Sequence, residues 1–343
     1  AARRKAGFKV AAISGSFGKT TTKELALSLF AKSGKKFFGT AGNLNNLIGL
    51  PQTILGAEGD EEYAVLELGI SLKGEMEELS AICEPDVALL TGVGIAHTEG
   101  LGDLEGVARE KVKIAASLRE GGVLIVPFGD RAIEKAVGEL EKPVKVKTFG
   151  WEKGADWHGE NLEELGAAGS RFTVDGVLVN VALAGRHNAQ NALAAIALTG
   201  EMGISPLQNG QISFAAAPQA LRGEIAEGPR GSKLLIDCYN ANPSAVVAAI
   251  DTLVGLAGGA KKILVLGDMR ELGAKSEEEH RKIGSYAAKS GVARIYLLGE
   301  EVRFVKDAAL KAGMANESVK IMADNGSLSG ELAKSLKKGD WVL

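Results

Sequence analysis

Residues 14–22, with the sequence SGSFGKTTT, form a glycine-rich loop that ends in a lysine and three threonines. The apolar run before the loop predicts a buried strand, and apolar residues at helical spacing over 23–32 predict a helix after it. This order places backbone N–H groups and a helix N-terminus around an anion. Lys19 would reach the β- and γ-phosphates of a nucleotide, and the Thr20 hydroxyl would ligate magnesium. The pattern favours a phosphate site over a plain strand-to-helix turn, although Ile13 replaces the usual first glycine.

Two further polar residues lie at the ends of predicted strands. Glu67 lies near the end of the apolar run 63–68, and His97 lies in a small-residue loop directly after the run 87–93. The carboxyl ends of parallel strands are where α/β sheets bind ligands. A surface glutamate and a structural histidine remain the alternatives for these two residues. With the glycine loop, they predict a phosphoryl-transfer site at one edge of a sheet.

Two other segments carry polar groups that the residues alone leave open. The loop 39–46 contains a dense set of amide donors and acceptors, which indicates either a binding loop or a mere turn. Its asparagines are Asn43, Asn45 and Asn46. The predicted helix 106–118 carries Arg109, Lys111 and Lys113. A run of charges on a helix is typical of a solvated face.

Apolar strands alternate with amphipathic helices for almost the full length, which predicts an α/β fold with a mostly parallel sheet. The residues from 150 to 169 predict an irregular polar stretch, and 171–182 predict an antiparallel hairpin turning at an Asp-Gly dipeptide. A helix over 188–198 follows, with Asn188 as its N-cap, and another helix is expected at 204–217.

The segment 218–223 predicts a linker, after which strands and helices alternate again. A chain of 343 residues is long enough for about two domains. We therefore expect one domain over 1–220 and a smaller α/β domain over 221–343.

Composition excludes several classes of protein. Hydrophobic residues make up 45% and the net charge is −3, so no global field would attract nucleic acid or an anionic membrane. The apolar runs are too short to span a bilayer, and no secretory leader opens the chain. The two cysteines, Cys83 and Cys238, are too few for a disulfide framework. A cytoplasmic monomer without nucleic-acid or membrane partners is expected.

Eight blocks, in this order, resemble the signature motifs of the Mur ligases. They are GSFGKTTTKE, GNLNNLIGLP, LELGI, VGIAHTEG, GVAREK, GRHNAQNALAA, IDCYNANP and VLGDMRELG. The blocks GNLNN, YNANP and GDMRELG are most similar to the members that add D-alanyl-D-alanine to UDP-N-acetylmuramoyl-tripeptide. The resemblance covers essentially the whole chain and implies a P-loop-type central ATPase domain followed by a Rossmann-like C-terminal domain.

Site residues follow from the resemblance where the motifs match. It implies that ATP contacts Gly15, Ser16, Gly18, Lys19, Thr20, Thr21, Asn188, Asn191, Arg222, Asp237, Tyr239 and Asn240. A first magnesium would be held by Thr20 and Glu67, and a second by His97 and a carbamylated Lys111. This replaces the solvated-face interpretation for Lys111. The catalytic group implied is Lys19, His97, Lys111 and Arg222.

The resemblance also implies the reaction, which is ATP-driven amide formation through an acyl phosphate. The substrates would be small molecules, a nucleotide-linked muramyl peptide and a dipeptide. Residues matching the substrate-facing positions are Asn43, Asn45, Asn46 and Asn242.

Two alternatives stay open from the sequence. The chain could be a Mur-like amide ligase for a non-muramyl carboxylate, such as a tetrapyrrole or a polyamino acid, or a nucleotide-binding scaffold that lost activity. In the family, a domain before the ATPase domain holds the UDP moiety, whereas Ala1 here lies shortly before the glycine loop. We therefore expect ATP binding to persist and the UDP-linked substrate to be handled poorly.

Overall fold

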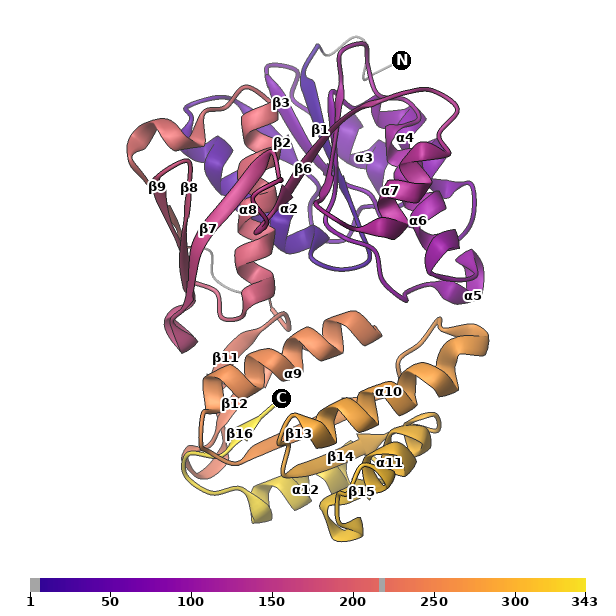
Figure 1. Ribbon diagram of the computed structural model, residues 1–343, viewed down its shortest axis with the longest axis vertical. Coiled ribbons are helices and arrows are strands. Elements are labelled where there is room, and N and C mark those ends of the chain that lie inside the picture. Colours follow the sequence, from indigo (N-terminus) through magenta and orange to yellow (C-terminus); the bar gives the residue numbers. More distant parts are fainter. Residues whose placement is uncertain (1–6, 216–219) are drawn as a thin grey trace. The chain divides into compact units, whose positions relative to one another are not determined.

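The computed structural model describes residues 7–215 and 220–343, and it divides into two units that we treat separately (Figure 1). The first unit holds the described residues up to Glu164 together with Ser170–Ala182 and the segment from His187 to 215. The second holds Leu165–Gly169, Leu183–Arg186 and the described residues from 220 to 343. The predicted boundary between 220 and 221 lies beside residues 216–219, which are outside the described part.

A ten-stranded sheet forms the centre of the described part of the first unit, in the order β10-β9-β8-β7-β6-β5-β4-β1-β3-β2. Across the sheet, each pair of neighbouring strands is parallel in the series β2, β3, β1, β4, β5, β6 and β7. Strand β8 is antiparallel to both of its neighbours, β7 and β9. The strands are β1 (Lys9–Ser14), β2 (Phe37–Gly39), β3 (Tyr63–Glu67), β4 (Val87–Leu90), β5 (Val123–Pro127), β6 (Lys145–Gly150), β7 (Trp157–Glu164), β8 (Ser170–Val174), β9 (Val177–Val181) and β10 (Gln211–Phe214).

Helices cover both faces of this sheet, which explains why its central strands are apolar on both sides. One face packs on α3, α4, α6 and α7 in a single apolar core. On the other face, Phe30 of α2 packs against the Tyr63 ring of β3. The helices are α2 (Lys19–Lys32), α3 (Gly49–Leu55), α4 (Glu75–Cys83), α5 (Thr98–Leu101), α6 (Leu104–Val112), α7 (Arg131–Gly138) and α8 (Arg186–Glu201), with 3-10 turns η1 (Lys113–Ala115) and η3 (Pro206–Asn209). The 3-10 turn η2 (Gly166–Ala168) belongs to the second unit.

Two of the predicted elements in this unit are wrong. The stretch from 150 to 169 is not irregular throughout, because β7 forms there and pairs with β6 and β8. The helix expected over 204–217 is a 3-10 turn followed by β10, and residues 216 and 217 lie outside the described part. Ile212 and Phe214 are buried while Gln211 is exposed, so the apolar period in this segment is two, and pairing with β9 selects the strand. The predicted hairpin is confirmed as β8 and β9.

The second unit contains a six-stranded sheet within its described residues, in the order β11-β12-β16-β13-β14-β15. Only the β11–β12 pair among these strands is antiparallel. The strands are β11 (Glu224–Glu227), β12 (Lys233–Ile236), β13 (Lys262–Gly267), β14 (Arg294–Leu298), β15 (Val319–Ile321) and β16 (Trp341–Val342). The α/β class predicted for both parts of the chain is confirmed.

The helices of the second unit lie on both faces of its sheet. Leu253 of α9 packs with Leu235 and Trp341, while Leu328 of α12 packs with Tyr296 in a separate cluster. The helices are α9 (Pro243–Ala257), α10 (Ser276–Lys289), α11 (Val302–Lys311) and α12 (Asn325–Ser335), with 3-10 turns η4 (Pro229–Gly231), η5 (Gly273–Lys275) and η6 (Asn316–Ser318).

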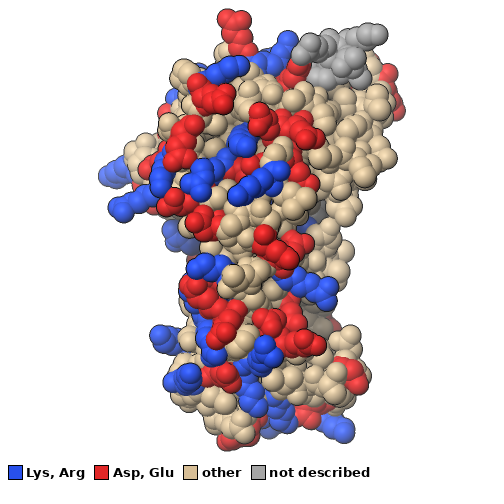
Figure 2. Space-filling view, turned by 90° about the vertical axis from the view of Figure 1, so that its right-hand side faces the viewer, with Lys and Arg blue, Asp and Glu red and all other residues tan. Residues whose placement is uncertain are grey.

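The surface drawn in Figure 2 carries acidic and basic side chains interspersed, without a large area of one sign. This agrees with the small net charge of −3. Among the described residues, none of the helices combines the length and the apolar character needed to cross a membrane.

Candidate active site

The glycine-rich loop joins β1 to α2, as predicted, and its glycines are required by close neighbours. A Cβ atom at Gly15 would lie 2.0 Å from the Thr91 hydroxyl oxygen. Gly18 has a φ of +75°, and a Cβ there would lie 2.3 Å from Asn191 Oδ1. A side chain at Gly15 would therefore displace Thr91, which follows β4, and a side chain at Gly18 would displace Asn191 of α8.

Residues just after β4 hold the loop in place. The Thr91 hydroxyl donates to the Phe17 carbonyl. Ser16 N–H donates to the Gly92 carbonyl at 2.9 Å, and Gly94 N–H donates to the Ser16 hydroxyl at 3.0 Å. The loop is thus shaped by protein contacts before any ligand binds. Sequence reasoning missed Thr91, although a polar residue at the end of an apolar run was the available signal.

Lys19 is the first residue of α2, and its ammonium donates to the Gly15 carbonyl at 2.7 Å. This bond folds the side chain over the loop. Thr20 follows and is buried, while Thr21 is partly exposed. The first turn of α2 contains no acidic residue and receives no side-chain cap from Gly18, so its N–H groups and Lys19 together suit an anion.

Glu67 ends β3, and its position is set by the parallel register that pairs it with Ile13, one residue before the end of β1. The residue is 2% exposed. Its Oε1 accepts from Asn45 Nδ2 at 2.9 Å, whereas Oε2 is buried with no hydrogen-bond partner among the described residues. A buried carboxylate oxygen without a partner is costly, and a cation would satisfy it.

The three asparagines of the loop 39–46 have different contacts. Asn45 binds Glu67, as described, while Asn46 Oδ1 accepts from the N–H groups of Ile48 and Gly49 before α3. Asn43 is exposed. Asn46 thus has a structural task that the sequence did not reveal, and a substrate role for these asparagines stays a prediction.

Lys111 on α6 is 0% exposed, and its Nζ has no hydrogen-bond partner in the described part of the chain. Burial lowers the pKa of Lys111 well below its usual range, the Lys19 charge lowers it further, and Glu110 acts in the opposite direction. The neighbouring basic residues instead reach carboxylates, Arg109 with Glu105 and Lys113 with Glu110. The solvated-face interpretation is therefore wrong for Lys111.

His97 precedes α5 in a left-handed conformation, with a φ of +56°. Its Nδ1 lies 3.5 Å from the Ser71 hydroxyl. Within residues 7–215 and 220–343, no three His, Cys, Asp or Glu side chains cluster as ready-made metal ligands. A metal role for His97 therefore depends on a ligand of another kind, such as the carbamylated Lys111 that the resemblance implies.

The structure brings α8 to the glycine loop. Asn188 and Asn191 are both buried, and Asn191 Nδ2 donates to Asn188 Oδ1 at 3.3 Å. The sequence predicted Asn188 as the N-cap of this helix. That prediction is wrong, because α8 begins two residues earlier, at Arg186. Both amides instead lie along the helix, and Asn191 contacts Gly18.

The remaining predicted residues belong to the second unit. The Arg222 guanidinium lies 3.9 Å from the centre of the Tyr239 ring. Burial raises the pKa of Asp237, and Arg222 and a backbone N–H offset part of that rise. Asn242 Oδ1 accepts from Ala245 N–H and caps α9. Asp237, Tyr239 and Asn240 line a cavity of about 500 Å³ beside β12 and β13.

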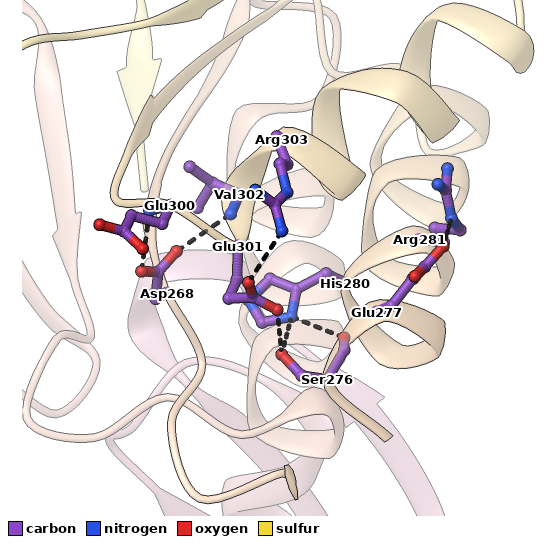
Figure 3. A network of polar contacts seen from close by, with 9 residues as sticks. All are labelled: Asp268, Ser276, Glu277, His280, Arg281, Glu300, Glu301, Val302 and Arg303. Atoms are coloured by element: carbon purple, nitrogen blue, oxygen red, sulfur yellow. Dashed lines mark hydrogen bonds and ion pairs between the residues drawn. The ribbon is translucent and has the colours of Figure 1, made fainter. Parts of the chain in front are cut away.

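The GDMRELG block, also in the second unit, is held by a polar network (Figure 3). Asp268 accepts from the N–H groups of Glu300 and Val302 at the start of α11. The buried His280 accepts from Met269 N–H at 3.0 Å, and its other ring nitrogen lies 2.8 Å from the Ser276 carbonyl oxygen. These contacts join β13, α10 and α11, so Asp268 and Met269 serve the fold of this unit.

Comparison with known proteins agrees with this geometry. The family model for the Mur ligase middle domain matches residues 13–199, and that for the Mur ligase, glutamate ligase domain matches residues 221–343. The chain is 33% identical to a Bacillus subtilis UDP-N-acetylmuramoyl-tripeptide–D-alanyl-D-alanine ligase over 98% of its own length and 72% of the relative. The enzyme of the same name from Escherichia coli is 34% identical over 90% of this chain and 68% of its own length.

Solved structures give the same result. MurF from Acinetobacter baumannii superposes with a TM-score of 0.83 at 28% identity, covering 99% of this chain and 74% of that one. MurF ligase from Thermotoga maritima, in complex with ADP, superposes with a TM-score of 0.82 at 28% identity, covering 100% and 78%. The glycine loop, the ends of β3 and β4 and both family models point the same way, and the chain belongs to the Mur ligase family.

Proposed function

We propose that this chain is an ATP-dependent amide ligase that adds D-alanyl-D-alanine to UDP-N-acetylmuramoyl-tripeptide. The names of its relatives and their 33–34% identity support the substrates. The observation that carries the chemistry concerns two ionisable side chains of the unit that holds the glycine loop. Glu67 and Lys111 each bury a polar atom, Oε2 and Nζ respectively, that has no hydrogen-bond partner among the described residues. A site that only bound nucleotide would use Glu67 for the cation that accompanies the phosphates, but it would not require the buried Lys111.

The reaction joins a carboxylate to an amine at the expense of ATP. The acceptor carboxylate attacks the γ-phosphorus, and ADP leaves with the electrons of the broken P–O bond. The amine then attacks the acyl phosphate carbonyl and loses a proton, and the tetrahedral intermediate expels phosphate. Lys19 opposes the negative charge that accumulates when two anions are brought together. Lys19, His97, Lys111 and Arg222 form the proposed catalytic group.

The proposed ATP site uses the glycine loop for the phosphates. The contact between Asn191 and Gly18 supports a role for α8 beside the nucleotide. In the second unit, the cation–π pair of Arg222 with Tyr239 offers a charged and an aromatic surface. The proposed nucleotide contacts are Gly15, Ser16, Gly18, Lys19, Thr20, Thr21, Asn188, Asn191, Arg222, Asp237, Tyr239 and Asn240.

Magnesium fits the residues at the end of β3. Divalent magnesium prefers oxygen ligands, and Glu67 Oε2 is a buried oxygen that lacks a partner in the described chain. Thr20 would supply a hydroxyl oxygen to the same ion. Bound there, magnesium would neutralise phosphate charge.

A carbamylated Lys111 is the second part of the proposed metal site, together with His97. The lowered pKa of Lys111 favours the neutral amine, which is the form that reacts with CO₂. The carbamate would replace this buried amine with an anion that suits a metal.

The proposed substrate contacts are Asn43, Asn45, Asn46 and Asn242. We further propose two domains, 1–220 and 221–343, in a cytoplasmic monomer.

Phosphate release tests this function. ATP is mixed with UDP-N-acetylmuramoyl-tripeptide and D-alanyl-D-alanine, and phosphate and the new amide are measured together. We expect equal amounts of both, with neither formed when the dipeptide is omitted. Phosphate release only with a non-muramyl carboxylate would replace the proposed acceptor, and ATP binding without turnover on any pair would favour a scaffold.

The Gly18→Ala variant is expected to weaken ATP binding, because its Cβ would meet Asn191 Oδ1 at 2.3 Å. Gly34→Ala is a matched control, since Gly34 has a φ of +72° and nothing within 4 Å of an added Cβ. Both variants carry the backbone strain of about 1–2 kcal/mol, whereas only the first disturbs the loop. Calorimetry with ATP separates them, and equal affinities would contradict the packing argument.

A further inference from the structure

Lys23 is a buried lysine that the proposed chemistry does not use. It lies one turn after Lys19 on α2 and is 1% exposed. Lysines are almost never buried to this extent unless they are paired. Its Nζ donates to the Thr40 carbonyl at 2.6 Å and forms an ion pair with Glu24 at 2.8 Å. Thr40, which directly follows β2, is more deeply buried than Glu24. Its carbonyl is therefore the partner of Lys23 that is better shielded from water.

Thr40 connects Lys23 to the end of β3. Its N–H donates to the Val65 carbonyl at 3.1 Å, and its hydroxyl accepts from the Glu67 N–H at 2.9 Å. The residue is 2% exposed, so these bonds are shielded from water. Thr40 therefore binds Lys23 through its carbonyl and Glu67 through its hydroxyl.

The same segment reaches Glu67 a second time. Asn45 Nδ2 donates to Glu67 Oε1 at 2.9 Å, and the Asn45 carbonyl accepts from Gly69 N–H at 2.8 Å. Glu67 is thus held at its backbone by Thr40 and at one carboxylate oxygen by Asn45. The other oxygen, Oε2, is the one without a hydrogen-bond partner in the described structure.

We propose that Lys23 is a positioning residue that fixes Thr40, and through it Glu67, so that Oε2 is presented to the divalent cation that binds with the nucleotide. This inference rests on the proposed function, because it requires Glu67 to be a metal ligand. Lys19 and Lys23 are four residues apart, so they lie on the same face of α2 but have different roles. The first serves the phosphates, and the second orients the carboxylate at the end of β3.

The Lys23→Met variant tests the inference through the cation dependence of nucleotide binding, measured with the non-hydrolysable analogue AMP-PNP. The magnesium concentration for half-maximal binding should rise about tenfold, as for other supports of a metal ligand. The affinity in EDTA should stay unchanged. Lys32→Met is the matched control, because Lys32 lies on the same helix and donates to the Ser213 carbonyl at 2.6 Å. A merely structural Lys23 would lower stability without moving the magnesium dependence.

Substitutions at Thr40 keep the test decisive if Lys23→Met fails to fold. Thr40→Val removes the acceptor for the Glu67 N–H and should shift the magnesium dependence, whereas Thr40→Ser keeps a hydroxyl and should not. Glu67→Gln is measured alongside. If Glu67→Gln shifts the dependence but Lys23→Met and Thr40→Val do not, the positioning role is overturned. If Glu67→Gln also leaves it unchanged, the metal role in the proposed function fails, and the inference fails with it.

Discussion

The Lys111→Met variant is expected to lose ligase activity by about 10²–10³-fold and yet to resist unfolding better than the unchanged chain. The activity falls because methionine cannot form the proposed carbamate. The stability rises because methionine fills a similar volume and removes a buried amine without a partner in the described structure, a group that costs about 1–3 kcal/mol. Phosphate release in the presence of bicarbonate measures the first effect. Urea unfolding in CO₂-free buffer, where Lys111 is a free amine, measures the second.

The stability gain should depend on pH in a predictable direction. The folded pKa of Lys111 is depressed below 10.5, so the unfolded chain binds more protons at this residue. The unchanged chain therefore gains stability from this residue as the pH rises from the folded pKa towards 10.5. In CO₂-free buffer, the advantage of Lys111→Met should be largest at low pH and should shrink as the pH rises.

Lys113→Met provides the control for both measurements. Lys113 is two residues away and lies 3.2 Å from Glu110 with a partly exposed side chain. Its replacement should leave activity near that of the unchanged chain. Short carboxylates such as propionate should partly restore activity to Lys111→Ala, which leaves room for them. Full activity in Lys111→Met, or no carbamate signal from ¹³C-bicarbonate in the unchanged chain by NMR, would reject the modified lysine.

The Lys19→Met variant is expected to bind ATP more weakly by about 1.5–3 kcal/mol, the value of a hydrogen bond to a charged group. Activity should fall further, by about 10²–10³-fold, because Lys19 opposes charge that develops during the reaction. The replacement also removes the 2.7 Å hydrogen bond from the Lys19 ammonium to the Gly15 carbonyl.

Comparison of two nucleotides makes the Lys19 experiment specific. AMP lacks the β- and γ-phosphates, so its affinity should be nearly the same in Lys19→Met and in the unchanged chain. ATP affinity should fall only in Lys19→Met and not in Lys32→Met, whose ammonium donates to Ser213 far from the loop in sequence. Equal ATP affinities in calorimetry, or a matching loss of AMP affinity, would contradict a phosphate role for Lys19.

Short-range features of the site were predictable from the sequence. The strand, the glycine loop and the helix are consecutive, so periodicity and glycine spacing identify them without any distant contact. The apolar runs at β3 and β4 likewise predicted where Glu67 and His97 would lie. The resemblance of the motifs to the Mur ligases added the roles that spacing alone left open, such as that of Lys111.

Long-range packing decided what the sequence left open or predicted wrongly. Pairing with β9 made a strand of β10 where a helix was expected. Lys111 looked like one charge among three on a solvated helix, but the packing of α6 against the sheet buries it completely.

The amino-acid sequence by itself determined the glycine loop, the α/β alternation and the family, because these depend on residues close together in the chain. The tertiary structure alone decided which polar groups lack partners. Glu67 Oε2 and Lys111 Nζ lack them among the described residues because of how distant segments pack around them. Residues 14–18, 91–94 and Asn191 meet at the loop for the same reason. A side chain's burial and partners are sums over contacts that sheet register and helix packing create, and local sequence does not contain them.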